Sequence, residues 1–323
     1  MTTHALGRTH AVPRWVRARY DLLPLLVIFA VELVIYLHYN SSLFTVSSII
    51  ALSVQFLPLI LATMGQSVIM LVGGIDLSLG AALSLSVAIL ATRSGSSISS
   101  VLLASLLCIV VGLLIGGLTG TLVSYARLPP IIVTLATSFV WAGAALFVLP
   151  QPGGQVPENL VSSYNGYSGN APIALAIIVV ALLIWKFIKS THQGMNMYAT
   201  GDNERGAFTS GLNVRRVKVT AYVLAGFFTA VAGIGLALET GSGDPNIGIP
   251  YTLNSITAAV LGGVSFFGGV GEMKGAVIGA LVLGFLINIL NYTGMQSFYQ
   301  YILEGVVLIV AISLKAFTMR QEA

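Results

Sequence analysis

The sequence Gly73-Gly74-Ile75-Asp76-Leu77-Ser78-Leu79-Gly80 places one carboxylate between two long apolar runs. Asp76 is the only acidic residue between Glu32 and Glu158. A charged side chain inside a bilayer is costly, about 2.5–3.5 kcal/mol even on an insertion scale. A chain that keeps one there uses it for a solute path, a relay or a structural break. The paired glycines favour a break, because glycine permits backbone conformations that end a helix.

Composition excludes most other classes of protein. Of the 323 residues, 56% are hydrophobic and only 8% are charged, and the mean hydropathy is +0.92. A soluble domain carries roughly 25% charged residues, so a single-domain soluble enzyme is excluded. The formal net charge is +4, but the basic residues do not form one patch, so no nucleic-acid partner is expected. The sequence predicts an all-α polytopic membrane protein.

Apolar runs long enough to cross a bilayer, about 20 residues each, recur along the chain and predict about ten transmembrane helices, some broken at glycines. This organisation gives a tail at 1–21, a transmembrane domain at 22–317 and a second tail at 318–323. The predicted spans are 22–38, 47–72, 76–92, 101–125, 131–149, 171–188, 218–239, 253–266, 274–292 and 298–317.

The distribution of positive charge predicts the orientation. With the amino terminus inside, the outward loops hold one basic residue, Arg93, and the inward segments hold the other fourteen Lys and Arg. This asymmetry is what the positive-inside rule predicts. We therefore expect an even number of spans in the cell inner membrane, with both termini cytosolic.

The cytosolic loop at 189–217 contains a second informative segment, residues 202–211. It predicts a short helix whose first turn is capped by Asp202 or Asn203 and complemented by Glu204, with Gly211 as a left-handed C-cap. With Arg205 and Gly206 it forms a candidate docking element for another protein. The alternative is a solvated helix that only connects two spans.

Glycine spacing predicts close helix packing. Gly112, Gly116 and Gly120 form two overlapping small-xxx-small steps, and Gly275 with Gly279 forms another. Such steps let helix backbones approach closely in lipid.

Several kinds of chemistry have no motif in the sequence. It contains no Gly-x-x-x-x-Gly-Lys-Ser/Thr phosphate loop, and its four histidines have no zinc-site spacing. No Ser/His/Asp set can be assembled from inward-facing positions. We therefore expect no catalytic residue, no metal and no cofactor on this chain.

Five stretches in combination resemble a known family, the membrane-spanning permease subunits of bacterial ATP-binding-cassette importers for ribose, other monosaccharides and autoinducer-2. This family lies in the superfamily of branched-chain amino-acid permeases. The stretches are Gly65-Gln66 through Gly80; Pro129-Pro130-Ile131-Ile132-Val133-Thr134-Leu135; Tyr198-Ala199-Thr200-Gly201-Asp202-Asn203-Glu204 through Val214; Ala258 to Val260 with Gly262-Gly263-Val264-Ser265 and Gly268-Gly269-Val270-Gly271; and Gly275 through Asn288, Asn291 and Tyr299-Gln300.

The resemblance implies an assembly rather than a protein that works alone. It implies two permease chains, two cytosolic ATP-binding subunits that hold ATP and Mg²⁺, and a periplasmic sugar-binding protein. It also implies that residues 202–211 couple the ATPase to the membrane helices. Where many members carry Glu-Leu-Asp-Ala-Ile, this chain has Thr252-Leu253-Asn254-Ser255-Ile256, which leaves open whether the two permease chains are identical.

Polar residues within the spans are candidates for the solute path. Their alternative role is hydrogen bonding between helices, worth about 0.6 kcal/mol each, and for Asp76 it is to cap a half-helix beginning at Leu77. In the outer loop, Asp244 and Asn246 are candidates for docking the binding protein, with a plain turn as the alternative. The candidate path residues are Gln66, Asp76, Ser78, Thr134, Asn288, Asn291 and Gln300.

Two rival functions stay open. An ion-coupled secondary transporter would use Asp76 as a proton or sodium site. A membrane scaffold would only anchor a cytosolic complex. Neither the solute nor the resting conformation follows from the sequence.

Overall fold

The computed structural model describes residues 23–166 and 172–294, and beyond them only residues 296, 299, 302, 303, 305, 306 and 309. The described residues form helices and their connections, with one isolated β-bridge between Gly153 and Gly243 and no longer strand. The all-α prediction is therefore confirmed. The predicted tails at 1–21 and 318–323 lie outside the described residues.

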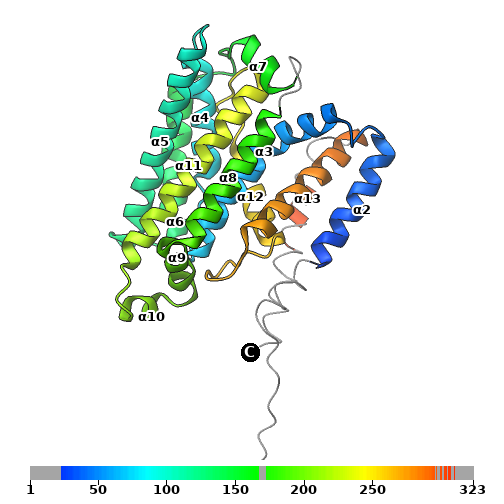
Figure 1. Ribbon diagram of the computed structural model, residues 1–323. Helices are drawn as coiled ribbons and strands as arrows, with labels where there is room; N and C mark the ends of the chain where they lie inside the picture. The colour runs from blue at the N-terminus through cyan, green and yellow to red at the C-terminus, as the bar shows by residue number, and fades with distance from the viewer. Residues whose placement is uncertain are drawn as a thin grey trace, which may run out of the picture.

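Figure 1 shows the described helices as one elongated bundle with α2 and α13 along one side. The helices are α2 (Leu23–Tyr39), α3 (Val46–Leu71), α4 (Leu79–Arg93), α5 (Ile98–Ser124), α6 (Pro130–Val148), α7 (Glu158–Tyr164), α8 (Ile173–Ser190), α9 (His192–Asp202), α10 (Glu204–Thr209), α11 (Val214–Thr240), α12 (Ile249–Leu261) and α13 (Met273–Tyr292).

Six of these helices, α3, α5, α6, α8, α11 and α13, are long and apolar enough to cross a membrane. Helices α2, α4 and α12 are apolar but shorter. These nine helices fall on nine of the predicted spans, and the tenth, 298–317, lies mostly outside the described residues. The count of about ten is not confirmed, but the membrane class is.

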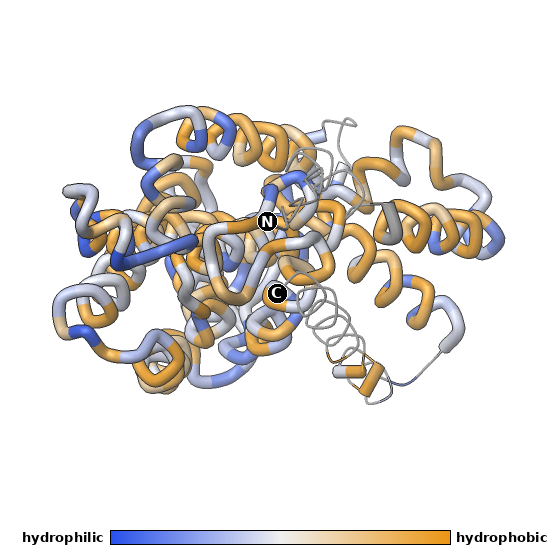
Figure 2. Tube along the Cα trace, turned by 90° about the horizontal axis from the view of Figure 1, so that it is seen from below, coloured by the Kyte–Doolittle hydropathy of each residue, from blue (hydrophilic) through white to orange (hydrophobic). Residues whose placement is uncertain are grey.

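The outer surface of the bundle is apolar. Helices α5 and α6 expose Leu114, Phe139 and Phe147, the last of them 88% exposed. Figure 2, which views the bundle from below, shows hydrophobic residues along the helices and hydrophilic ones mainly in the connections. Apolar patches of this extent are rare on soluble monomers and suit contact with lipid.

Helix α11 is the centre of the bundle and packs against α3, α4 and α5. The backbones of α11 and α5 approach each other closely at glycines. A methyl group at Gly112 would lie 2.5 Å from the carbonyl oxygen of Gly226, and one at Gly116 would overlap the carbonyl oxygen of Tyr222. The predicted close packing along Gly112, Gly116 and Gly120 is therefore confirmed.

Helix α13 packs against α2, α3 and α12. Phe285 lies at this junction, with its ring centroid 5.1 Å from that of Tyr36 and 5.0 Å from that of Phe56. A methyl group at Gly279 would overlap the carbonyl oxygen of Ala258 on α12. The second predicted glycine step therefore also marks a close helix contact.

The two ends of the bundle differ. Helices α9 and α10 lie at one end, and α7 lies at the opposite end (Figure 1). Neither α7 nor α9 is predicted from the sequence, because both are short and lack an apolar run. We refer to these ends as the α10 end and the α7 end.

Two predicted helices have different bounds in the structure. Helix α4 begins at Leu79, not at 76 or 77, and α12 spans Ile249–Leu261 rather than 253–266. Pro250 near the start of α12 favours an earlier beginning. Its end is set by Gly263, which has a φ of +86°, a conformation typical of a helix C-terminus.

Candidate functional site

Helix α3 ends at the paired glycines. The amide of Gly73 donates to the carbonyl of Met70 at 2.9 Å, and that of Gly74 donates to the carbonyl of Ile69 at 3.0 Å. With a φ of +76° at Gly73, this is the Schellman pattern of helix termination. The predicted break is therefore present, and residues 72–78 form the connection to α4.

Asp76 lies within this connection and is almost fully buried. Its Oδ1 accepts hydrogen bonds from the Ser78 amide at 2.7 Å and from the Ser78 hydroxyl at 2.6 Å. Ser78 is the N-cap residue of α4. Asp76 therefore binds the N-cap residue of α4, Ser78, and is not itself the N-cap of a helix that begins at Leu77. The carboxylate accepts from the amide two positions ahead, which is the pattern of an Asx-turn, and the first helical turn follows this turn.

The backbone of the connection is held from two neighbouring helices. The amide side chain of Gln66, in the orientation that satisfies both its ends, donates to the Asp76 carbonyl at 3.1 Å and accepts from the Asp76 amide at 3.2 Å. The Thr134 hydroxyl donates to the carbonyl of Ile75 at 3.3 Å. Gln66 and Thr134 are both fully buried. Four of the predicted path residues, the fourth being Ser78, thus converge on residues 75–78.

Tyr222 belongs to the same site, although the sequence gives no signal for it beyond a single tyrosine in an apolar span. Its hydroxyl is buried and has no hydrogen-bond partner among the described residues. A methyl group at Gly74 would lie 2.8 Å from that hydroxyl. The absence of a side chain at Gly74 therefore makes room for a polar atom beside the break.

The first turns of α4 and α12 cap each other. The Gly80 amide donates to the Thr252 hydroxyl at 3.1 Å, and the Gly248 amide donates to the Ser84 hydroxyl at 2.9 Å. Amides in the first turn have no partner within their own helix, so each short helix satisfies one amide at the other's N-terminus. The backbones touch, because a methyl group at Gly80 would overlap the Gly248 carbonyl oxygen.

At the α10 end, the short helix predicted within residues 202–211 is present as α10, and it follows directly on another helix, α9. Helix α9 ends at Asp202, and α10 covers Glu204–Thr209. Of the two predicted caps, Asn203 is the one used, since its Oδ1 accepts from the Gly206 amide at 2.9 Å. Gly211 has a φ of +85° and follows the C-cap Ser210, which confirms the predicted left-handed termination.

A family model described as "Branched-chain amino acid transport system / permease component" matches residues 48–312. The chain belongs to this family. Because the match covers most of the chain, it makes the protein a component of a transport system rather than an enzyme. It also confirms the resemblance inferred from the five sequence stretches.

Named relatives of the permease are importer subunits. The "Ribose import permease protein RbsC" of Bacillus subtilis (strain 168) is 37% identical over 261 residues, 79% of this chain and 80% of that protein. The protein of the same name from Escherichia coli (strain K12) is 32% identical over 321 residues, 97% and 98% of the two chains. The "D-allose transport system permease protein AlsC" of the same strain is 31% identical over 275 residues, 84% and 83% of the two chains. No solved structure gave a significant match.

The remaining candidate path residues of the permease lie elsewhere. Asn288 on α13 exchanges two hydrogen bonds with Gln55 on α3, at 2.6 and 2.9 Å. Gln55 precedes Gln66 by eleven residues, about 16 Å along a helix. Asn291 is exposed near the end of α13, and Gln300 lies outside the described residues. The structure therefore does not bring these three together with Asp76.

The candidate docking residues of the permease form a turn between α11 and α12. The Asn246 amide donates to Oδ1 of Asp244 at 2.8 Å. Just before them, the amides and carbonyls of Gly153 and Gly243 pair reciprocally at 2.9 and 2.8 Å. Asn246 is exposed and Asp244 is half-buried, so the turn presents one polar side chain to its surroundings.

A groove of about 1390 Å³ opens at the α10 end, between α10 and the connection from α5 to α6. Its cationic lining consists of Arg127, Arg205, Arg215 and Lys218. One carboxylate, Glu204, also lines it and pairs with Lys218 at 2.8 Å. Phe208 projects from α10 and is 72% exposed. The groove therefore combines unbalanced positive charge with an exposed aromatic ring.

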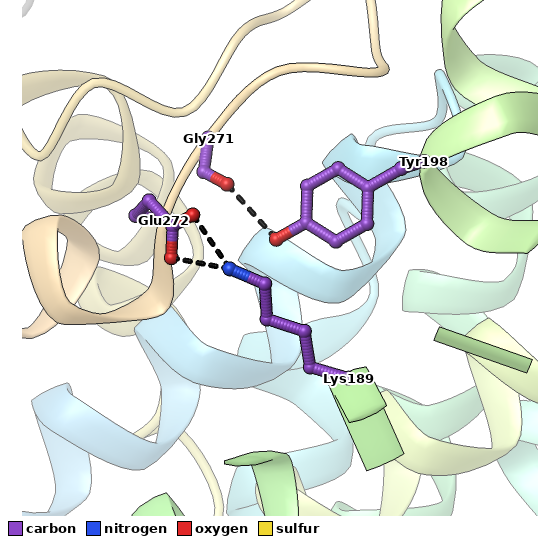
Figure 3. A network of polar contacts seen from close by, with 4 residues as sticks. All are labelled: Lys189, Tyr198, Gly271 and Glu272. Carbon is purple, nitrogen blue, oxygen red and sulfur yellow. Dashed lines mark hydrogen bonds and ion pairs between the residues drawn. The ribbon is translucent and has the colours of Figure 1, made fainter. Parts of the chain in front are cut away.

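A further polar cluster ties α8 and α9 to the connection between α12 and α13 (Figure 3). Nζ of Lys189 lies 2.5 and 2.6 Å from the two carboxylate oxygens of Glu272 and 5.5 Å from the ring centroid of Tyr198. The Tyr198 hydroxyl donates to the Gly271 carbonyl at 3.0 Å. Burial raises the pKa of Tyr198, and the Glu272 charge adds to the rise, so the phenol stays protonated and donates.

Sequence reasoning missed this cluster, because Lys189 and Glu272 are 83 positions apart. Their side chains are 37% and 51% exposed. Exposed ion pairs contribute only about 0–1 kcal/mol to stability. The contacts therefore add little stability, and they join α8 and α9 to the connection between α12 and α13.

Proposed function

We propose that the chain is the permease subunit of an ATP-driven importer that carries a monosaccharide across the cell inner membrane. The observation that carries this proposal is the similarity to a ribose import permease along almost the whole of both chains. The similarity to a D-allose permease supports a monosaccharide as the class of solute.

In this proposal the chain works within an assembly. Two cytosolic ATP-binding subunits hold ATP and Mg²⁺, a periplasmic protein binds the sugar, and a second permease chain, identical or not, completes the path. The chain crosses the membrane ten times with both termini cytosolic, since the basic residues then lie almost entirely inside. The α10 end faces the cytosol and the α7 end faces outward.

We assign the docking of the ATPase to α10 and the groove beside it. The candidate coupling residues Asp202, Asn203, Glu204, Arg205, Gly206 and Gly211 all lie on or next to α10. The cations of the groove and the exposed Phe208 suit a partner surface with acidic and apolar side chains, because complementary charge orients such encounters. The exposed Asn246 and half-buried Asp244 are proposed to meet the binding protein.

The solute path is assigned to the polar residues inside the bundle. Gln66, Asp76, Ser78 and Thr134 surround the break, and Asn288, Asn291 and Gln300 are proposed to lie farther along the path. For a neutral sugar no counter-charge is needed. Gln66, Asp76, Ser78 and Thr134 also hydrogen-bond within residues 75–78 or to them. We therefore assign them a structural role in holding the break as well.

Uptake of labelled ribose and allose into proteoliposomes tests the proposal. The permease is reconstituted with the ATPase subunits and binding protein that co-purify with it, and we expect uptake that needs ATP and the binding protein. ADP in place of ATP, and omission of the binding protein, are the controls. Uptake by the permease alone, driven by a proton or sodium gradient, would replace the proposal with an ion-coupled transporter.

A further inference from the structure

The connection between α12 and α13, residues 262–272, touches both α9 and the end of α3. We infer that this connection is the relay through which movement of α9 reaches the Asp76 segment. The inference rests on the proposed function, because it assumes that a partner at α10 moves α9. It assigns a positioning role to Lys189, Tyr198 and Glu272.

The first observation is a junction of three backbones. The Gly269 amide donates to the Leu71 carbonyl at 3.0 Å. A methyl group at Gly201 would overlap that same carbonyl oxygen, and one at Gly268 would lie 2.7 Å from the Gly201 carbonyl oxygen. These contacts are between backbone atoms, with no side chain between them. Packed groups of this density transmit displacement rather than absorb it.

The second observation is the polar cluster on the same connection. Lys189 and Tyr198, from α8 and α9, bind Glu272 and Gly271 (Figure 3). The connection thus contacts α9 at two places, by backbone at residues 268–269 and through the Tyr198 bond to Gly271, and it is tied to the end of α8 through Glu272. Two attachments constrain its orientation as well as its position, so it must follow α9 when α9 moves.

The third observation is that the junction of the three backbones contacts Gly73, at the start of the connection that contains Asp76. A methyl group at Gly268 would lie 3.0 Å from the Gly73 amide nitrogen, and Gly73 is the residue whose positive φ ends α3. Three residues later, Asp76 is held by Gln66 and Ser78. A shift of the connection therefore acts on the hinge of the break itself.

The conformation of the relay depends on glycine. Gly268, Gly269 and Gly271 have φ values of +91°, +67° and +145°, which other residues rarely adopt. A methyl group at Gly269 would also lie 2.5 Å from the Asp202 amide nitrogen. Both the strain and the overlap would push the connection away from α9.

Hydrogen exchange of the purified permease tests the mechanical link without any partner. Lys189→Glu and Glu272→Lys each break the ion pair, and we expect amides of residues 71–78 to exchange about fivefold faster or more, while α5 is unchanged. The double exchange K189E/E272K restores an ion pair and should restore slow exchange. Lys186→Glu is the control, because Lys186 is an exposed cation on the same helix that makes no ion pair among the described residues.

Reconstituted transport tests the consequence. We expect each single reversal to reduce the ribose taken up per ATP hydrolysed by about fivefold or more, and the double exchange to recover it. A protein that had merely lost stability would lower both rates together, so the ratio separates coupling from folding. Exchange at residues 71–78 equal to that of K186E, or an unchanged ratio in both singles, would overturn the relay.

The two experiments distinguish a wrong function from a wrong relay. Absence of ATP-driven uptake by the wild type, with the exchange effect intact, would contradict the proposed function and leave the mechanical link standing. Normal wild-type uptake with no effect of either reversal would contradict the relay alone.

Discussion

Asp76 and Gln66 hold one peptide segment from two sides. The carboxylate of Asp76 binds the N-cap residue of α4, and the amide of Gln66 binds both the N–H and the C=O of Asp76. Buried peptide groups outside a helix need such partners, because an unsatisfied one costs about as much as a lost hydrogen bond. The polar side chains of Asp76 and Gln66, which could bind a sugar, therefore already form hydrogen bonds with backbone groups.

Two substitutions of Asp76 distinguish the effect of its hydrogen bonds from the effect of its charge. Asp76→Asn keeps an oxygen that accepts from Ser78, so we expect normal folding and most of the uptake. Asp76→Ala removes both hydrogen bonds and should lower the unfolding free energy by about 1–2 kcal/mol. Thermal unfolding in detergent and uptake of labelled ribose measure the two effects. A well-folded D76N variant without uptake would instead assign the charge to the solute path.

Gln66→Leu has nearly the same volume but leaves the Asp76 amide and carbonyl without partners. We expect a loss of about 1–3 kcal/mol for each unsatisfied group, seen as a lower unfolding temperature. Gln55→Leu on the same helix is the control, since its pair with Asn288 is an ordinary interhelical bond worth about 0.6 kcal/mol. Equal losses in the two variants would show that Gln66 has no special role at the break.

At the scale of elements, α4 and α12 depend on each other. Each is too short to span the hydrocarbon alone, at 15 and 13 residues, against about 20 for a spanning helix. Each begins inside the bundle, where its first amides have no water. The two hydroxyls, Thr252 and Ser84, supply the missing acceptors across the contact.

Thr252→Val tests this dependence with almost no change of shape. The Gly80 amide loses its acceptor, and we expect a loss of about 1 kcal/mol together with faster amide exchange at the start of α4. Thr252→Ser keeps the hydroxyl and should behave like the wild type. If valine and serine gave the same unfolding temperature and exchange, the mutual capping would be irrelevant to stability.

At the scale of the whole molecule, the bundle has a distinct end for each proposed partner. The α10 end carries the cationic groove, and the α7 end carries the paired glycines 153 and 243 with the turn at Asp244. The lateral surface between them is apolar. This division fits a protein that meets different aqueous partners on the two sides of a membrane.

Cysteine labelling tests the orientation. The native Cys108 is buried, so we expect it not to react with a membrane-impermeant maleimide. Ser96→Cys, in the connection before α5, should react in intact cells from which the outer membrane has been removed. Ser210→Cys, beside α10, should react only after the inner membrane is permeabilised. The opposite pattern would invert the proposed topology.

Local features of this fold could be predicted from sequence and long-range ones could not. Apolar run lengths locate the spans, and paired glycines locate the break, because both depend on neighbouring residues. The bond from Thr134 to Ile75 joins positions 59 apart, and that from Gly80 to Thr252 joins positions 172 apart. Such contacts depend on how the helices pack, which the composition of either partner does not determine.

The meeting of α4 and α12 also balances charge. A helix N-terminus carries about half a positive elementary charge. That of α4 lies two residues after Asp76, and that of α12 contacts α4 at Gly80. Helix α12 contains no acidic residue and has neutral Thr252 and Asn254 in its first turns, so it brings no second carboxylate to that balance. The charge of Asp76 thus needs no lysine or arginine beside it. The partial positive charges of two helix ends thus face each other across the Gly80–Gly248 contact, four residues along the chain from a single carboxylate.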